Sequence, residues 1–280
     1  MSASARVSRA LALALCLLVP AIAGAGTPPL RVVSINLCTD QLAMALAAPG
    51  QLVSVSYLSA DPRMSMMADR AAAYPLNHAG AEEVYLMRPD LVLGGIYTNR
   101  GSVEILQRLG VPVLLLPPVD RLEDVAAQMR TVGAALGRTA EAEAQVAAFE
   151  AALAALRVDL PPVTAAQYHP NGYTTGTGTL ADEIMRHTGY ANIAARAGVA
   201  GGGVLALERL VMEDPQVIVT ARPWPGASRS EELLVHPALA ALRARAAQVP
   251  LADAGWSCGT PAMLAAVAGM AAARRAMEGR

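Results

Sequence analysis

Short apolar runs alternate with longer segments of helical periodicity along most of this chain. Runs rich in Val, Ile and Leu predict buried strands, and apolar residues spaced three and four apart predict amphipathic helices. In the first half, the predicted strands are Arg31–Ile35, Leu52–Ser56, Asp90–Gly94 and Pro112–Leu116. The predicted helices there are Thr39–Ala47, Ser102–Leu109 and Leu122–Leu136. This alternation favours an α/β fold.

A long uninterrupted helix is predicted in the middle of the chain. Residues 138–160 contain no Gly or Pro and are mostly Ala, Glu, Gln and Leu, and Pro161 and Pro162 follow them. Four apolar residues fall on one helical face, namely Val146, Phe149, Leu153 and Leu156. At 1.5 Å per residue such a helix is roughly 30 Å long, enough to cross from one lobe of a protein to another.

The alternation resumes after this helix. Predicted strands are Val163–Tyr168, Gln216–Thr220 and Gln248–Leu251, and predicted helices are Thr179–Thr188, Leu207–Glu213 and Thr260–Ala276. Two segments have the same pattern in the same frame: residues 82–93 and residues 208–219 each contain a Glu, a short amphipathic helix, a Pro seven residues later and a buried strand. One such unit is common, but two of them on either side of a long helix indicate two similar lobes.

The N-terminal segment has the pattern of a secretory leader. Arg6 and Arg9 precede a short apolar run, Pro20 ends it, and small residues follow, so we expect cleavage near Ala23 or Ala25. The run is shorter than the about 20 apolar residues of a membrane span. Lipid attachment at Cys16 is the alternative, but bulky Leu15 disfavours it. The sequence therefore predicts export and loss of residues 1–25.

Composition and charge narrow the function further. The chain is 54% hydrophobic and 16% charged, which indicates a folded globular protein. Its net charge of −1 gives no reason to expect binding to nucleic acid or to an anionic membrane. After loss of the leader two cysteines remain, Cys38 and Cys258. In an oxidising compartment they either form a disulfide or stay as two buried thiols.

The order and spacing of several segments resemble the periplasmic receptors of ABC importers for ferric siderophores and cobalamin. These segments are residues 31–40, Glu82 with residues 88–92, residues 109–113, the long helix, residues 176–180, and Glu208 before Asp214-Pro215. After the signal peptide at 1–25 that the leader pattern predicts, the resemblance implies an N-terminal α/β lobe at 27–137, a linker helix at 138–160 and a C-terminal α/β lobe at 161–280. A ligand cleft between the lobes and limited hinge closure are also implied.

The same resemblance assigns a partner and two docking residues. Glu82 and Glu208 match the glutamates with which this family docks on arginines of the permease dimer in the inner membrane. Two separated carboxylates are suited to charge-assisted pairing that fixes an orientation. The alternative is that both are solvated residues in the first turn of a helix, stabilised by its dipole. We expect a periplasmic monomer that works with such a permease.

Aromatic and cationic residues in the predicted loops are the candidates for ligand contact. Aromatic residues make up only 4% of the chain, so those that follow strands are informative. Aromatic faces suit a large planar or cyclic ligand, and arginines suit the negative oxygens of an iron chelate. The candidates are Tyr57, Arg63, Tyr97, Arg100, Tyr173, Arg222, Trp224 and Trp256. Each one taken singly is equally consistent with loop packing or a surface charge.

Other chemistries have weaker support in the sequence. The glycine-rich residues 171–179 precede a helix and either hold an anion or form a turn and cap, and they lack the Lys of a P-loop. The four histidines, His78, His169, His187 and His236, are scattered along the chain and do not form a set of metal ligands. Capture of a bare metal or of haem by the same fold is therefore a less favoured alternative. An exported α/β enzyme with Cys258 as nucleophile and His169 as base is a further alternative, but no catalytic motif supports it. We expect no catalysis and no resident cofactor.

Overall fold

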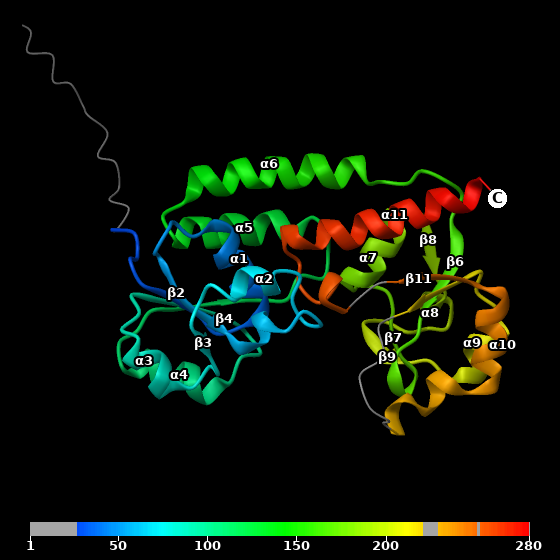
Figure 1. Cartoon of the computed structure of the whole chain (residues 1–280), viewed down its shortest axis with the longest axis horizontal. Helices are drawn as coiled ribbons and strands as arrows, with labels where there is room; N and C mark the ends of the chain where they lie inside the picture. The colour runs from blue at the N-terminus through cyan, green and yellow to red at the C-terminus, as the bar shows by residue number, and fades with distance from the viewer. Residues whose placement is uncertain (1–26, 221–228, 251–252, 280) are drawn as a thin grey trace, which may run out of the picture.

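The computed structural model of this chain describes residues 27–220, 229–250 and 253–279. The predicted signal peptide lies outside these ranges. Among the described helices, none combines the length and the apolar character needed to cross a membrane. Two separate sheets occupy the two halves of the molecule, with α6 along its upper edge (Figure 1).

The first lobe is built on a parallel five-stranded sheet in the order β3-β2-β1-β4-β5. Its strands are β1 (Val32–Ser34), β2 (Leu52–Ser56), β3 (Leu76–Asn77), β4 (Leu91–Gly95) and β5 (Val113–Leu116). Its helices are α1 (Leu37–Leu46), α2 (Ala68–Ala71), α3 (Ala81–Leu86), α4 (Arg100–Arg108) and α5 (Asp124–Ala135). Helix α1 begins two residues earlier than predicted, because the side chain of Asn36 accepts hydrogen bonds from the backbone N–H groups of Cys38 and Thr39.

The second lobe has a parallel four-stranded sheet in the order β11-β10-β6-β8 and a small antiparallel pair, β7 with β9. Its strands are β6 (Val163–Gln167), β7 (Tyr173–Thr175), β8 (Tyr190–Asn192), β9 (Gly202–Val204), β10 (Val217–Thr220) and β11 (Ala247–Pro250). Its helices are α7 (Leu180–His187), α8 (Ile193–Arg196), α9 (Leu207–Glu213), α10 (Pro237–Arg245) and α11 (Leu264–Glu278). The sequence did not predict β7, β8, β9, α8 or α10.

The two sheets have the same order over four strands. In the first lobe the order β2-β1-β4-β5 places the first strand beside β4, and in the second lobe β8-β6-β10-β11 places β6 beside β10 in the same way. The repeated segments lead into the matching strands β4 and β10. In both segments the residue before the proline has a left-handed backbone conformation, with φ of 50° at Arg88 and 42° at Asp214. The sequence repeat therefore corresponds to a repeated backbone unit.

Helix α6 (Thr139–Ala155) lies in sequence between the two lobes and packs along α5. Its 17 residues correspond to about 25 Å, shorter than predicted. The helix ends before Arg157 because the chain then turns to the second lobe, where the backbone N–H of Val158 donates to the carbonyl of His187 at 3.1 Å. The role of α6 as a rigid linker stays a prediction.

One hydrophobic core extends through both lobes. It includes Val32 and Leu93 of the first sheet, Phe149 of α6, and Ala165 and Val217 of the second sheet. Helix α11 lies beside α6 in the view of Figure 1 and contributes to the same core. The lobes therefore share one buried apolar cluster, although the predicted domain boundaries divide them into separate units.

Candidate ligand site and docking surfaces

The lobes meet at the carboxyl ends of their parallel strands. Cys38 lies in the first turn of α1, directly after β1, and Cys258 follows β11. The structure joins the two cysteines by a disulfide with a Cα–Cα distance of 5.2 Å. The carboxyl edge of a parallel sheet is where α/β proteins place ligands. The bond therefore lies at the edges where a ligand site is expected.

Two further contacts surround this bond. The hydroxyl of Thr260 donates to the side-chain carbonyl of Gln41 at 2.9 Å, and both residues are 1% exposed. Gly259 closely approaches Val119, which follows β5, since a Cβ on Gly259 would lie 2.4 Å from the Cβ of Val119. We call the disulfide and these two contacts together the interlobe junction.

The disulfide also bears on the enzyme alternative. A cysteine nucleophile acts as a thiolate. Cys258 is 2% exposed and its sulfur is bonded to that of Cys38. The structure therefore gives Cys258 no thiol with which to attack a substrate, and this form of the alternative is wrong.

A buried carboxylate lies just behind the junction in the first lobe. Asp40 is fully buried, and its Oδ2 accepts hydrogen bonds from the hydroxyls of Ser56 at 2.5 Å and Ser59 at 2.6 Å. Burial raises the pKa of Asp40 to about 6, although hydrogen bonds from serines, including Ser34, oppose the rise. These serines connect Asp40 to the 3-10 turn Tyr57–Ala60, which carries one of the candidate ligand residues.

The candidate residues of the first lobe lie in loops after the strands. Tyr57 is 49% exposed and stacks on His78 with ring centroids 4.9 Å apart. Tyr97, after β4, is 84% exposed. Arg100 begins α4 and pairs with Glu104 at 2.7 Å, so its charge is partly neutralised within its own helix. Arg63 lies in the loop after β2 and is half-buried.

In the second lobe the structure brings two candidate residues together around a histidine. The ring of His169, just after β6, lies 6.1 Å from the ring of Tyr173 and 5.8 Å from that of Trp256. His169 is buried, whereas Tyr173 is 40% exposed. Trp256 is also two residues from the disulfide. Arg222 and Trp224 lie outside the described residues.

Sequence reasoning did not place two histidines among the contact candidates, His78 beside Tyr57 and His169 beside Tyr173 and Trp256. Each follows a strand of a parallel sheet, β3 for His78 and β6 for His169. For His169 the predicted strand Val163–Tyr168 provides this signal, the same one that selected the aromatic residues. Strand β3 was not predicted, so no such signal was available for His78. Within the described ranges, no three His, Cys, Asp or Glu side chains come together as a metal site.

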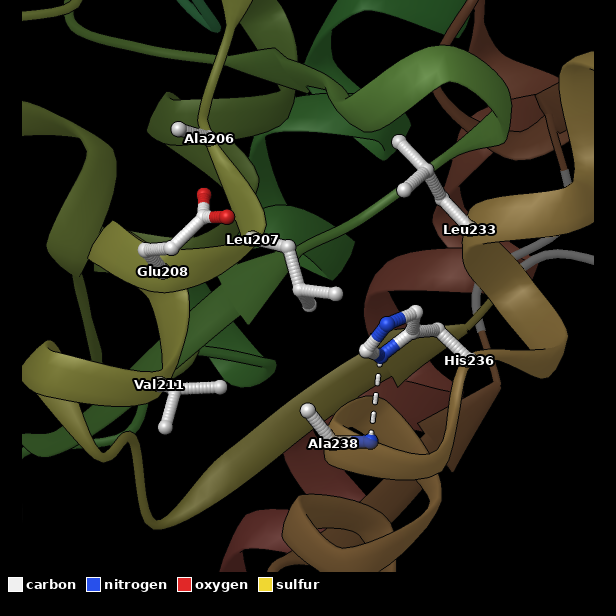
Figure 2. Close-up of a pocket in the computed structure, with 7 residues that line it drawn as sticks. All are labelled: Ala206, Leu207, Glu208, Val211, Leu233, His236 and Ala238. Carbon is white, nitrogen blue, oxygen red and sulfur yellow. Dashed lines mark hydrogen bonds between the residues drawn. The ribbon is translucent and has the colours of Figure 1, made fainter.

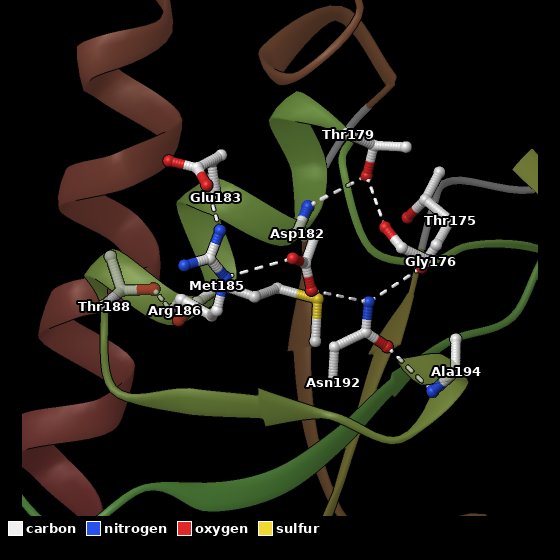
Figure 3. Close-up of polar contacts among 10 residues, drawn as sticks. All are labelled: Thr175, Gly176, Thr179, Asp182, Glu183, Met185, Arg186, Thr188, Asn192 and Ala194. Atoms are coloured by element: carbon white, nitrogen blue, oxygen red, sulfur yellow. Dashed lines mark hydrogen bonds and ion pairs between the residues drawn. The ribbon is translucent and has the colours of Figure 1, made fainter. Parts of the chain in front are cut away.

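The glycine-rich segment 171–179 contains β7 and ends at Thr179, the N-cap residue of α7. Thr179 caps this helix, because its hydroxyl oxygen accepts from the backbone N–H of Asp182 at 3.2 Å. The Asp182 carboxylate is itself buried and accepts hydrogen bonds from Asn192 at 3.1 Å and Arg186 at 3.0 Å (Figure 3). A carboxylate already stands at this helix end, which disfavours a second anion there.

The two docking candidates occupy matching positions on the repeated helices. Glu82 and Glu208 lie in the first turns of α3 and α9, and both are exposed. Neither takes part in an ion pair among the described residues. Glu83, next to Glu82, caps α3, and Glu213, at the other end of α9 from Glu208, pairs with arginines.

A cavity of about 550 Å³ opens beside Glu208. Figure 2 shows the Glu208 carboxylate and the His236 ring among the residues that line this cavity, with the Leu207 side chain between them. His236 caps α10, since its Nδ1 accepts from the backbone N–H of Ala238 at 3.1 Å. The surface around this carboxylate is therefore mainly apolar.

Two α/β lobes with parallel sheets, a helix between them in sequence and candidate ligand residues at the strand ends match the architecture of two-lobed binding proteins. A family model described as "Periplasmic binding protein" matches residues 32–248. The chain belongs to the periplasmic binding protein family. This family binds substrates and is non-catalytic.

Known proteins similar to this chain are named for different ligands. The vitamin B12-binding protein of Yersinia pseudotuberculosis is 26% identical over 197 residues, which cover 68% of this chain and 69% of that protein. A periplasmic heme-binding protein from Pseudomonas aeruginosa has a TM-score of 0.71 at 23% identity, covering 88% of this chain and 92% of that one. An Fe3+-hydroxamate transport protein from Saccharomonospora viridis has a TM-score of 0.62 at 22% identity, covering 86% and 91%. At these identities the solved structures establish the fold.

Proposed function

We propose that this chain is a periplasmic receptor that captures an iron chelate or a cobalamin-like ligand between its lobes and delivers it to a membrane permease dimer. The family and the leader-like residues 1–25 support the periplasmic location. The protein works as a monomer and catalyses no reaction.

The observation that carries the proposal is the aromatic cluster of His169, Tyr173 and Trp256 at the carboxyl end of β6. Aromatic faces at this edge of the sheet suit the flat or ring-shaped surface of a macrocycle or a metal chelate. Exposed Tyr57 and Tyr97 in the first lobe supply similar surface after β2 and β4. The ligand would then contact aromatic side chains from both lobes.

Haem is the second candidate ligand. Imidazole and phenol groups are axial ligands of haem iron, and the cluster contains both. Tyr173 is the more accessible of these two, because His169 is 6% exposed and Tyr173 is 40% exposed. Tyr57, at 49% exposure, offers a phenol from the other lobe.

Calorimetric titration of the mature chain tests the ligand class. The ligands are a ferric hydroxamate, a ferric catecholate, cobalamin and haem. We expect saturable one-to-one binding of one of them, and a loss of at least tenfold in affinity for Tyr173→Ala. Tyr85→Ala is the matched control, since this tyrosine of α3 is 45% exposed. Equal losses in the two variants, or no binding of any ligand, would contradict the proposal.

The docking role of Glu82 and Glu208 is part of the same proposal. Beside each carboxylate the repeated helix also exposes a large apolar residue four positions later, Leu86 at 71% and Met212 at 76%. A permease surface with an arginine next to an apolar side chain fits both patches.

The double variant Glu82→Gln/Glu208→Gln should keep its ligand affinity but lose most of its ability to support uptake. The control is Glu104→Gln, which removes an exposed carboxylate that is already paired within α4. Full uptake by the double variant would show that these carboxylates do not dock.

A further inference from the structure

The interlobe junction holds the two lobes together at the edges where the proposed ligand enters. A rigid-body hinge that opened these edges would have to separate Cys38 from Cys258, and Gln41 from Thr260. These pairs are 220 and 219 residues apart in sequence, so no local chain connection accounts for their contact. They arise only from the way the lobes sit against each other.

The covalent bond limits this motion far more strongly than the hydrogen bond does. A buried neutral hydrogen bond contributes on the order of 1 kcal/mol, which thermal motion overcomes readily. Disulfides tolerate Cα–Cα distances of roughly 4.4 to 6.8 Å. With the two α-carbons at 5.2 Å, the lobes can therefore separate at this point by no more than about 2 Å while the bond is intact.

We propose that the Cys38–Cys258 bond fixes the separation of the lobes at the strand ends and so sets the size of ligand that the site admits. Trp256 adds to this role, because it lies two residues from the bond and contacts His169. The bond thereby positions an aromatic wall of the second lobe relative to α1 of the first. This inference rests on the proposed function only for the location of the ligand.

A site of fixed width has a predictable binding behaviour. Little conformational ordering accompanies binding of a ligand that fits, which favours its affinity, and a larger ligand is excluded because the walls cannot move apart. Breaking the bond frees the lobes at this point. The fitting ligand then binds more weakly, and the difference in affinity between ligands of different size becomes smaller.

The distance between the lobes tests the inference without any ligand. Spin labels attached through a ketone-bearing amino acid at Ile105 of α4 and Ala240 of α10 leave the cysteines unaltered, and both residues are exposed. Pulsed electron resonance then compares the wild-type chain, the same chain after reduction, and the variant Cys38→Ser/Cys258→Ser. We expect a narrow distance distribution with the bond and a broader one without it.

Ligand binding is measured on the same proteins with haem, cyanocobalamin and a ferric hydroxamate. We expect the ligand that binds most tightly to bind at least fivefold more weakly without the bond. We also expect the ratio between the highest and the lowest affinity of the three probes to become smaller. Reductant must leave the double variant unchanged, and circular dichroism shows that reduced and variant proteins remain folded. If the variant does not fold, the reversibly reduced wild-type chain provides the comparison.

The outcomes separate the two proposals. Identical distance distributions with and without the bond would overturn the inference, whatever the ligands do. Identical affinities for every probe would overturn the size-selection role. Absence of binding by every probe in both forms would count against the proposed function, while a broadened distribution would still support the restraint on the lobes.

Discussion

Asp40 places an ionisable group where water is excluded, and this makes the stability of the first lobe depend on pH. The carboxyl is fully buried, and burial raises its pKa from 3.8 to about 6. A difference of about two between these pKa values corresponds to about 3 kcal/mol. Oδ2 of the carboxylate accepts hydrogen bonds from two serines, whereas Oδ1 is buried without a hydrogen-bond partner.

The sign follows from the direction of the pKa change. Well below pH 3.8 the carboxyl is protonated in both the folded and the unfolded chain. The contribution of the neutral Asp40 carboxyl to the free energy of unfolding is then fully present. As the pH rises through 6 the folded protein must hold a buried charge, and that contribution is lost. Asn has nearly the same shape, keeps an acceptor for Ser56 and Ser59, and never ionises.

Asp40→Asn should therefore become more stable relative to the wild-type chain as the pH rises. The difference in free energy of unfolding should grow by about 2.5 kcal/mol between pH 4 and pH 7.5. Urea unfolding followed by circular dichroism at several pH values measures it. Asp69→Asn is the control, since this residue of α2 is exposed. A difference that stays constant within about 0.5 kcal/mol would refute the reasoning.

Two further pairs of substitutions compare a buried position with an exposed one. Arg274 of α11 is 1% exposed and donates to the carbonyls of two loop residues, at 2.6 and 3.3 Å. Arg274→Met should lower the thermal midpoint and cost about 3 kcal/mol, whereas Arg275→Met next to it should cost less than about 1 kcal/mol. Equal costs would show that burial of the guanidinium is unimportant. Gly133→Ala in α5 would place a Cβ 2.3 Å from that of Ala142 in α6 and should destabilise by about 1–3 kcal/mol. In Gly269→Ala of α11 the new Cβ meets nothing within 4 Å, so this change should instead stabilise the protein by about 0.5–1 kcal/mol. Urea unfolding measures both effects. Stabilisation by both changes would contradict the close contact between α5 and α6.

The sequence predicted the fold best where the pattern of apolar residues is long or repeated. The class of fold, most strands of both sheets and the repeated unit before β4 and β10 all followed from it. Strand β8 was not predicted, because Tyr190–Asn192 is three residues long and ends in a polar residue. What makes it a strand is its pairing with β6, which is a tertiary contact.

The candidate site was less accessible to such reasoning. Loop position alone selected Tyr173 and Trp256, which the structure brings to the same histidine although they are far apart in sequence. The contact of Gln41 with Thr260 joins residues that no periodicity relates. Contacts of this kind depend on how the lobes pack, and the pattern within each lobe carries no information about that packing.

The position of the two cysteines also affects how the protein matures. The sequence contains one other cysteine, Cys16, which lies within the predicted leader. If the predicted leader is removed, a single chain has only one possible internal pairing, so oxidation produces no wrongly paired isomer that an isomerase would have to correct. In an exported chain the bond can close only after the strands of both sheets have reached the oxidising compartment, because Cys258 follows the last of these strands. Helix α11 still lies after Cys258. A closed bond, visible as faster migration on a non-reducing gel, is therefore expected only in chains exported at least as far as Cys258.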